Sequence, residues 1–201
     1  MIPAANVLIS VITRDYVYAG TVRWLCQQRY PVHIIQTPYT IEHQRNLQIA
    51  EFLKTKAEWL FIVDADVVPR RGTIEVLLED SQPRKVRVAP PWAFSSETKK
   101  RHPMAYNRHD DGLFYPVSYE ADAGEPQVCV SEVDLSGMSG ALLPRKLLEG
   151  LHRPWFKMTH DDQGFLVATE DVYFWKSVQD AGYIIEAWLN LTADHSKIQL
   201  I

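Results

Sequence analysis

The chain has 201 residues, 46% of them hydrophobic and 23% charged, which excludes a largely disordered polypeptide. Its formal net charge of -4 excludes the basic surface of a nucleic-acid-binding protein. Two cysteines, Cys26 and Cys129, are too few for a disulfide framework and lack zinc-ligand spacing, which indicates a reducing compartment. No apolar run approaches the roughly 20 residues that span a bilayer. We therefore expect a soluble, cytoplasmic protein that would visit a membrane only peripherally, from solution.

Strands and helices alternate in the first half of the chain. The continuous β-branched run at residues 7–12 predicts a strand covered on both faces, as in a parallel sheet. Further strands are predicted at residues 32–35, 60–63 and 86–89, and helices at 16–28, 42–56 and 72–79. This order is typical of a doubly wound α/β unit, in which ligands bind at the carboxyl ends of the strands.

The second half alternates less regularly. Strands are predicted at residues 113–117, 128–135, 138–143, 183–187 and 189–192, and helices at 146–151 and 169–181. No internal repeat or linker separates the two halves. We therefore expect an α/β fold with one domain over residues 1–201, in which helices flank a central mixed, mostly parallel sheet.

The sharpest motif is Asp64-Ala65-Asp66, which directly follows the predicted strand at residues 60–63. Two carboxylates at a strand end can face one ligand, and such oxygen ligands suit Mg²⁺ or Mn²⁺ bound to substrate phosphates. The alternative interpretation is two solvated carboxylates in an ordinary turn, because a DxD tripeptide often occurs by chance.

Glu170 and Asp171 open the predicted helix at residues 169–181 behind Thr169, a good N-cap. Acidic residues in a first turn need no further explanation. Asp171, however, shares a helical face with Trp175 and Val178, and a carboxylate on an inward stripe requires a partner or a pocket. A structural and a functional interpretation therefore both stand.

Three further features are candidates, each with an ordinary alternative. His195 follows a strand-like run and could be a ligand, although an isolated histidine is more often a surface or core residue. Arg45 could pair with a phosphate and Asn46 could hydrogen-bond a base or ribose, or both could belong to an ordinary polar helix face. The glycines of residues 136–140 mark a tight turn or close backbone approach, and they match neither a P-loop nor a dinucleotide-binding fingerprint.

In chain order these segments form a recognisable series: VLISVITRD, QRN, WLFIVDADVVP, SGMSGALLPRKLLEGLHRPWF, TEDVYFWKSVQDAGYIIE and ADH. The series resembles the GT-A fold glycosyltransferases, particularly the family 2-like group, over about residues 7–195. The resemblance implies an enzyme that transfers a sugar from a nucleotide-diphosphate donor of UDP, GDP or ADP type. It also implies a nucleotide-binding half at residues 1–92 and a donor-sugar and acceptor half at residues 93–201.

The resemblance also implies roles for individual residues. The nucleotide would be bound by Thr13, Arg14, Asp15, Arg45, Asn46 and Asp64. The metal, Mn²⁺ or Mg²⁺, would be held by Asp66 and His195, with Asp64 assisting. The donor sugar and acceptor would lie near Gly137, Ser139, Gly140 and Trp155. Asp171, within Glu170-Asp171, would be the general base of an inverting reaction.

The acceptor, whether glycan, lipid or protein, is not identified by these motifs. We expect its subsites in the polar loops at residues 94–108 and 157–164, which should be mobile and become ordered when donor binds. Two rival functions remain. A sugar-nucleotide nucleotidyltransferase also uses acidic pairs and Mg²⁺. Such an enzyme is expected to have a glycine-rich loop after the first strand, where this chain has TRDYVYAG. A non-catalytic nucleotide-sugar-binding module could share the fold.

Overall fold

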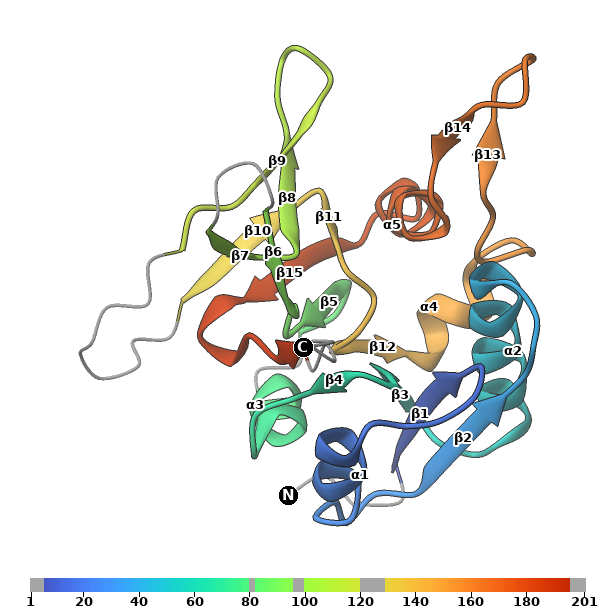
Figure 1. Cartoon of the computed structure of the whole chain (residues 1–201), viewed down its shortest axis with the longest axis vertical. Coiled ribbons are helices and arrows are strands. Elements are labelled where there is room, and N and C mark those ends of the chain that lie inside the picture. The colour runs from blue at the N-terminus through green and yellow to red at the C-terminus, as the bar shows by residue number, and fades with distance from the viewer. Residues whose placement is uncertain (1–5, 80–81, 96–99, 120–128, 196–201) are drawn as a thin grey trace, which may run out of the picture.

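The computed structural model describes residues 6–79, 82–95, 100–119 and 129–195 (Figure 1). The described helices are α1 (Ala19–Leu25), α2 (Ile41–Lys54), α3 (Thr73–Glu79), α4 (Arg145–Gly150), α5 (Glu170–Asp180) and a 3-10 helix at Leu189–Leu191. The strands of the main sheet are β1 (Val7–Thr13), β2 (Val32–Gln36), β3 (Trp59–Asp64), β5 (Lys85–Val88), β10 (Val130–Val133), β12 (Ala141–Pro144) and β15 (Ile184–Trp188).

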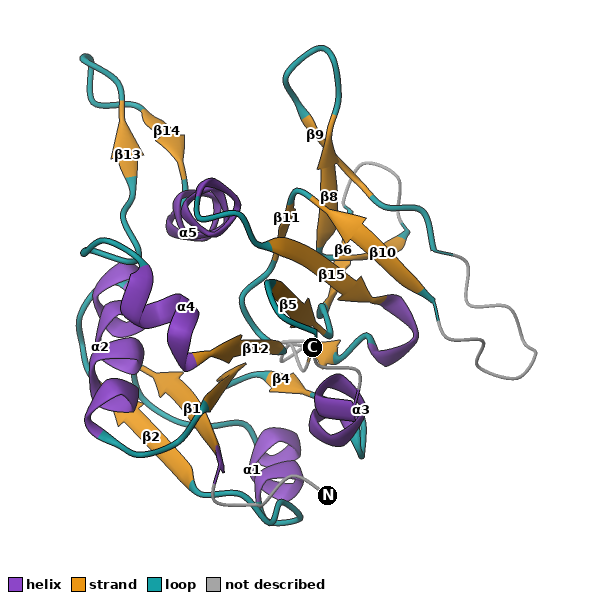
Figure 2. Cartoon of the chain, turned by 180° about the vertical axis from the view of Figure 1, so that it is seen from behind, coloured by secondary structure: helices purple, strands orange, loops and turns teal. Residues whose placement is uncertain are grey.

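Smaller sheets and hairpins surround this main sheet. Their strands are β4 (Val67–Val68), β6 (Trp92–Phe94), β7 (Arg101–Pro103), β8 (Ala105–Arg108), β9 (Phe114–Pro116), β11 (Leu135–Ser136), β13 (Thr159–His160), β14 (Leu166–Ala168) and β16 (Asp194–His195). The β8–β9 and β13–β14 hairpins project from the same end of the molecule in both views (Figures 1 and 2).

The main sheet has seven strands in the order β10-β15-β5-β12-β3-β1-β2. Strands β2, β1, β3, β5 and β15 run in one direction, whereas β12 and β10 run the opposite way. The mixed, mostly parallel α/β sheet expected from the sequence is therefore confirmed. Because β12 lies between β3 and β5, the sheet interleaves strands from residues 1–92 with strands from residues 93–201.

Helices cover both faces of the sheet, and the alternation of side chains along each strand supplies both cores. All seven residues of β1 are buried. Leu8 belongs to the apolar cluster under α2, α4 and α5, whereas Val7, Ile9 and Val11 belong to the cluster under α1 and α3. A strand apolar on both faces can sit only inside such a three-layer arrangement, as the run at residues 7–12 predicts.

Several predicted boundaries are wrong. Helix α1 begins at Ala19, not at residue 16, because Tyr18 is extended and its N–H donates to the carbonyl of Ala65 at 2.9 Å. The strand predicted at residues 138–143 begins at Ala141. The strand predicted at 189–192 is largely a 3-10 helix, in which the N–H of Thr192 donates to the carbonyl of Leu189. The predicted strand at 128–135 contains β10, and residue 128 lies outside the described residues.

The two segments expected as loops contain strands. Residues 94–108 include β7, β8 and the end of β6, while residues 96–99 lie outside the described part. Residues 157–164 contain β13 and the turn of its hairpin. Their ordering on donor binding stays a prediction. None of the helices in the described residues is long and apolar enough to cross a bilayer.

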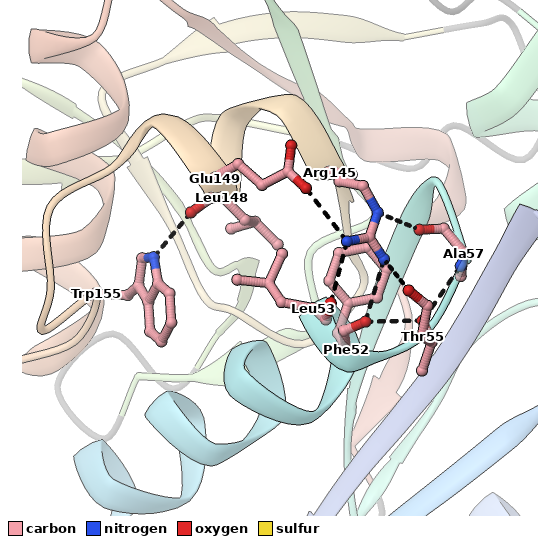
Figure 3. A network of polar contacts seen from close by, with 8 residues as sticks. All are labelled: Phe52, Leu53, Thr55, Ala57, Arg145, Leu148, Glu149 and Trp155. Carbon is pink, nitrogen blue, oxygen red and sulfur yellow. Dashed lines mark hydrogen bonds and ion pairs between the residues drawn. The ribbon is translucent and has the colours of Figure 1, made fainter.

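Arg145 joins the end of β12 to the end of α2 (Figure 3). The last carbonyl groups of a helix have no partner within the helix, and here one guanidinium supplies the donors. Its Nε donates at 2.8 Å to the carbonyl of Ala57, and its terminal nitrogens donate to the carbonyls of Phe52, Leu53 and Thr55. The guanidinium also lies 4.7 Å from the centroid of the Phe52 ring. One side chain thus holds α2 in place beside the sheet.

Replacing Arg145 by alanine should therefore lower the free energy of unfolding by about 3 kcal/mol, because charge-assisted bonds to several carbonyls are lost together. Urea denaturation of the purified variant measures this change. The matched control is Glu149→Gln, since Glu149 forms only an exposed ion pair with Arg145 at 3.3 Å and should change stability by less than about 1 kcal/mol. Equal effects of the two substitutions would contradict the assignment.

Candidate active site

A cavity of about 810 Å³ lies where β1 and β3 end, at the carboxyl edge of the sheet. Parallel strands bring their carboxyl ends to one edge, which is where ligands of such sheets bind. Its walls come from the segment after β1, the turn after β3 and the start of α2. Met158 and His195, from the second half of the chain, complete them. The lining residues are Ile12, Thr13, Arg14, Asp15, Tyr16, Tyr18, Pro38, Tyr39, Thr40, Ile41, Gln44, Asp64, Ala65, Asp66, Met158 and His195.

Asp66 and His195 are separated by 129 positions and are in direct contact in this cavity. Nε2 of His195 lies 2.9 Å from Oδ2 of Asp66. Antiparallel pairing of β16 with β4 brings them together, because His195 lies opposite Val67, the residue after Asp66. A carboxylate and an imidazole are both side-chain metal ligands. The structure thus places two of the three expected metal ligands side by side.

Asp64, the third expected ligand, ends β3 and pairs with a buried cation. Its Oδ1 lies 2.7 Å from the guanidinium of Arg45, whose side chain is only 3% exposed. Gln48 accepts a hydrogen bond from Arg45 and donates to Ser10 on β1, so the ion pair is anchored to the sheet. Within the described residues, no group of three or more His, Cys, Asp or Glu side chains is arranged to hold a metal ion.

The segment at residues 137–140 supports the site from beneath and does not line the cavity. The hydroxyl of Ser139 accepts the N–H of Asp64 at 3.0 Å. Gly140 has a φ of 85°, and a Cβ there would lie 2.0 Å from the carbonyl oxygen of Ala89. The N–H of Gly137 donates to the carbonyl of Met104. These residues, expected near the donor sugar, therefore allow backbones to approach closely and fix the position of Asp64.

Asn46 and Trp155 also lie outside the cavity. The Asn46 amide donates to the carbonyl of Phe156 at 2.8 Å and accepts the N–H groups of Trp155 and Phe156. Trp155 is 4% exposed, and its indole N–H donates to the carbonyl of Leu148. Successive helical residues point about 100° apart, so Arg45 reaches Asp64 while Asn46 faces the neighbouring segment. Neither residue lines the cavity, and the expectations that Asn46 binds nucleotide and that the donor sugar and acceptor lie near Trp155 stay predictions.

Thr13, Arg14 and Asp15 line the cavity, as expected for the segment that follows β1. Sequence reasoning missed three tyrosines beside them, namely Tyr16, Tyr18 and Tyr39. The rings of Tyr16 and Tyr18 lie 5.4 Å apart, and Tyr16 and Tyr39 are 58% and 56% exposed. Exposed aromatic faces next to a cavity suit a flat ligand group such as a base. The two aromatic residues at positions 16 and 18 are the available signal in the sequence, although the sequence pattern predicts a helix over both.

Asp171 lies behind Asp64 at the start of α5. Burial raises the pKa of the Asp171 carboxyl from 3.8 to about 7. The charges of Glu170 and Asp64 act in the same direction, whereas the Arg45 guanidinium and the Met138 backbone N–H lower this pKa. Oδ1 of Asp171 is shielded from solvent and has no hydrogen-bond partner among the described residues. Asp171 and the adjacent, buried Glu170 do not line the cavity itself, although Asp171 is electrostatically coupled to Asp64 within it.

Comparison with known proteins supports the fold. The sequence matches no protein-family model and no curated protein. Among solved structures, A197 from STIV superposes with a TM-score of 0.66 at 19% identity, covering 94% of this chain and 85% of A197. GalNAc-T7, a GT-A glycosyltransferase solved with UDP, GalNAc and Mn²⁺, superposes with a TM-score of 0.63 at 9% identity. That match covers 95% of this chain and 44% of GalNAc-T7, so the chain spans under half of that protein. The chain therefore has a GT-A-like α/β fold.

The raised pKa of Asp171 predicts a pH-dependent stability. Between about pH 4 and pH 7 the folded chain holds a proton on Asp171 that the unfolded chain has released. The contribution of Asp171 to the free energy of unfolding therefore falls as pH rises through that range, and acidification restores it. Relative to Asp171→Asn, the wild type should lose free energy of unfolding from about pH 4 to about pH 7, measured by urea denaturation at each pH. A constant difference between the two proteins would contradict the raised pKa of this carboxyl.

Proposed function

We propose that this chain is a metal-dependent glycosyltransferase that moves a sugar from a nucleotide-diphosphate donor to an acceptor hydroxyl. The observation that carries the proposal is the contact of Asp66 with His195 in a cavity at the carboxyl edge of the sheet. The fold shared with GalNAc-T7, which was solved with UDP, GalNAc and Mn²⁺, supports a sugar nucleotide as ligand. Donors of UDP, GDP and ADP type all remain candidates.

The nucleotide would occupy the cavity between the segment after β1 and the start of α2. Thr13, Arg14 and Asp15 offer polar groups along one wall, and Tyr16 and Tyr39 offer exposed aromatic faces for the base. Asp64 would accept hydrogen bonds from the ribose, because Arg45 fixes the position of one of its oxygens. Arg45 itself is too buried to reach a phosphate without rearrangement.

Asp66 and His195 would hold Mn²⁺ or Mg²⁺. Such ions commonly take one or two protein ligands and complete their coordination with phosphate oxygens and water, which suits a two-residue site. When bound, the cation neutralises the charge that develops on the departing nucleoside diphosphate. The side chains of Asp66 and His195 are 32% and 25% exposed, so both are accessible from the cavity.

Asp171 would act as the general base of an inverting reaction, which requires a rearrangement that brings the acceptor hydroxyl to its carboxyl, because Asp171 does not line the cavity in this structure. It would take the proton of the acceptor hydroxyl as that oxygen bonds to the anomeric carbon and the nucleoside diphosphate leaves. A carboxyl with a pKa of about 7 is well suited to proton transfer near neutral pH. Glu170 would contribute through its charge, which raises the pKa of Asp171.

A non-catalytic nucleotide-sugar-binding module is the second candidate. One observation favours it, since Asp64, the first acid of the DxD motif, is engaged by Arg45. A nucleotidyltransferase is distinguished by its product, because it releases pyrophosphate whereas a glycosyltransferase releases nucleoside diphosphate.

Binding of a sugar nucleotide should raise the melting temperature in a Mn²⁺-dependent manner. A donor at about 100 times its Kd should shift the midpoint by about 5–10 °C. A thermal-shift screen of UDP-, GDP- and ADP-sugars with and without Mn²⁺ measures this. Asp66→Asn and His195→Ala should each abolish the Mn²⁺-dependent part, while Asp180→Asn, exposed at the far end of α5, should keep it. A full Mn²⁺ response in Asp66→Asn would remove the metal from the proposed function.

Asp171→Asn should separate binding from transfer. The amide cannot take a proton, so the rate of sugar transfer should fall by about 100-fold to 10,000-fold while the donor-induced thermal shift persists. Release of nucleoside diphosphate in the presence of an accepted hydroxyl compound, measured with a coupled assay, provides the rate. Asp180→Asn is the matched control. Unchanged transfer by Asp171→Asn would exclude this residue as the base, and absence of turnover with every donor that binds would favour the binding module.

A further inference from the structure

Strand β2 is an open edge of the main sheet. It pairs with β1 on one side and is the last strand in the order of the sheet. Among the described residues no strand pairs with its other side. Figure 1 shows β2 at the outer margin of the main sheet, next to β1.

The direction of the backbone groups along β2 follows from two hydrogen bonds. The carbonyl of Pro31 accepts the N–H of Ile9, and the N–H of Thr37 donates to the carbonyl of Thr13, so odd-numbered residues face β1. Backbone groups alternate in direction along a strand. The N–H and C=O groups of Val32, Ile34 and Gln36 therefore point away from the sheet. No backbone hydrogen bond to these groups occurs in the described part of the chain.

The side chains on this edge are unlike those of a protected edge strand. Val32 and Ile34 are 39% and 49% exposed, while Ile35 is buried on the opposite face of the strand, which α2 covers. The strand VHIIQ contains no lysine, aspartate, glutamate or internal proline. Natural proteins usually block open edges with charges, prolines or covering elements, because an unblocked edge pairs with another strand.

We propose that β2 pairs antiparallel with β2 of a second copy of this chain, forming a two-fold symmetric dimer with one continuous sheet. Antiparallel self-pairing about Ile34 places Ile34 opposite its own symmetry mate and Val32 opposite Gln36. In that register the outward N–H and C=O groups of Val32, Ile34 and Gln36 are all satisfied. No acidic or basic side chain of the strand faces its like across the axis.

A second copy fits this edge better than an isolated peptide, because α2 adds to the contact. Helix α2 packs over both β1 and β2. Pairing of the two β2 strands would bring the α2 helices of the two copies towards each other on the same face of the continuous sheet. Helix packing would then supplement a five-residue ladder that is too small to hold a dimer by itself.

Sedimentation velocity over a concentration series tests the proposal without any donor, so its failure would leave the glycosyltransferase proposal untouched. The wild type should shift with concentration from 23.1 kDa towards twice that mass. Ile34→Pro removes an outward N–H but no bond to β1, and should raise the dimer dissociation constant at least tenfold. Ile34→Val keeps the donor and a β-branched side chain and should dimerise like the wild type.

Circular dichroism and a melting curve establish that Ile34→Pro is folded. If it is not, Ile34→Lys provides the test, since it leaves the backbone intact and places two like charges at the axis; it should also weaken the dimer at least tenfold. A wild type that stays at 23.1 kDa at every concentration overturns the proposal. So does a folded Ile34→Pro or Ile34→Lys variant that dimerises as strongly as the wild type.

Discussion

The pairing of β16 with β4 is the constraint on which the candidate site depends. The acidic motif lies at the end of β3, where parallel topology places it at a ligand-binding edge, but the second side chain of the contact comes from the far end of the described chain. In the β16–β4 ladder His195 pairs with Val67 and Asp194 pairs with Val68. This pairing brings the His195 imidazole to within 2.9 Å of the Asp66 carboxylate, although the two residues are far apart in the sequence. Without this short ladder, Asp66 would face the cavity without the imidazole.

A buried cation organises the acidic residues behind this contact. Arg45 holds Asp64 by an ion pair and lowers the pKa of Asp171, opposing the burial that raises it. Burying an arginine is costly unless its charge is compensated, and here Asp64 and Gln48 provide the partners while Ser10 anchors Gln48 to β1. The same guanidinium thus fixes one carboxylate at the cavity and moderates the basicity of another beneath it.

Local patterns predicted the parts of this site that depend on strands, and failed where a long-range contact decides the structure. The buried run at residues 7–12 and the acidic pair at the end of β3 were readable because strand burial and topology determine them. The positions of Asn46 and Trp155 outside the cavity could not be predicted in this way, because helix rotation and the packing of residues 155–156 determine them. The sequence pattern predicts a helix over Tyr16 and Tyr18, because no local feature reveals the hydrogen bond from the Tyr18 N–H to the Ala65 carbonyl. Strands β16 and β4 pair through only two residues each, which is too few to show a strand-like periodicity in the sequence.

The proposed cation site would have a thermodynamic consequence for donor binding. In the proposed function Asp66 and His195 would supply two ligands, whereas Mg²⁺ and Mn²⁺ favour about six, so the ion would gain much of its coordination from donor phosphates and water. Cation and donor would then each raise the affinity of the other by the same factor, because coupling between two bound ligands is reciprocal. The ion pair of Asp64 with Arg45 would strengthen this coupling, since it engages a carboxylate that could otherwise bind the cation in the absence of donor. A site incomplete without its donor would hold the ion chiefly when a diphosphate is present to be activated.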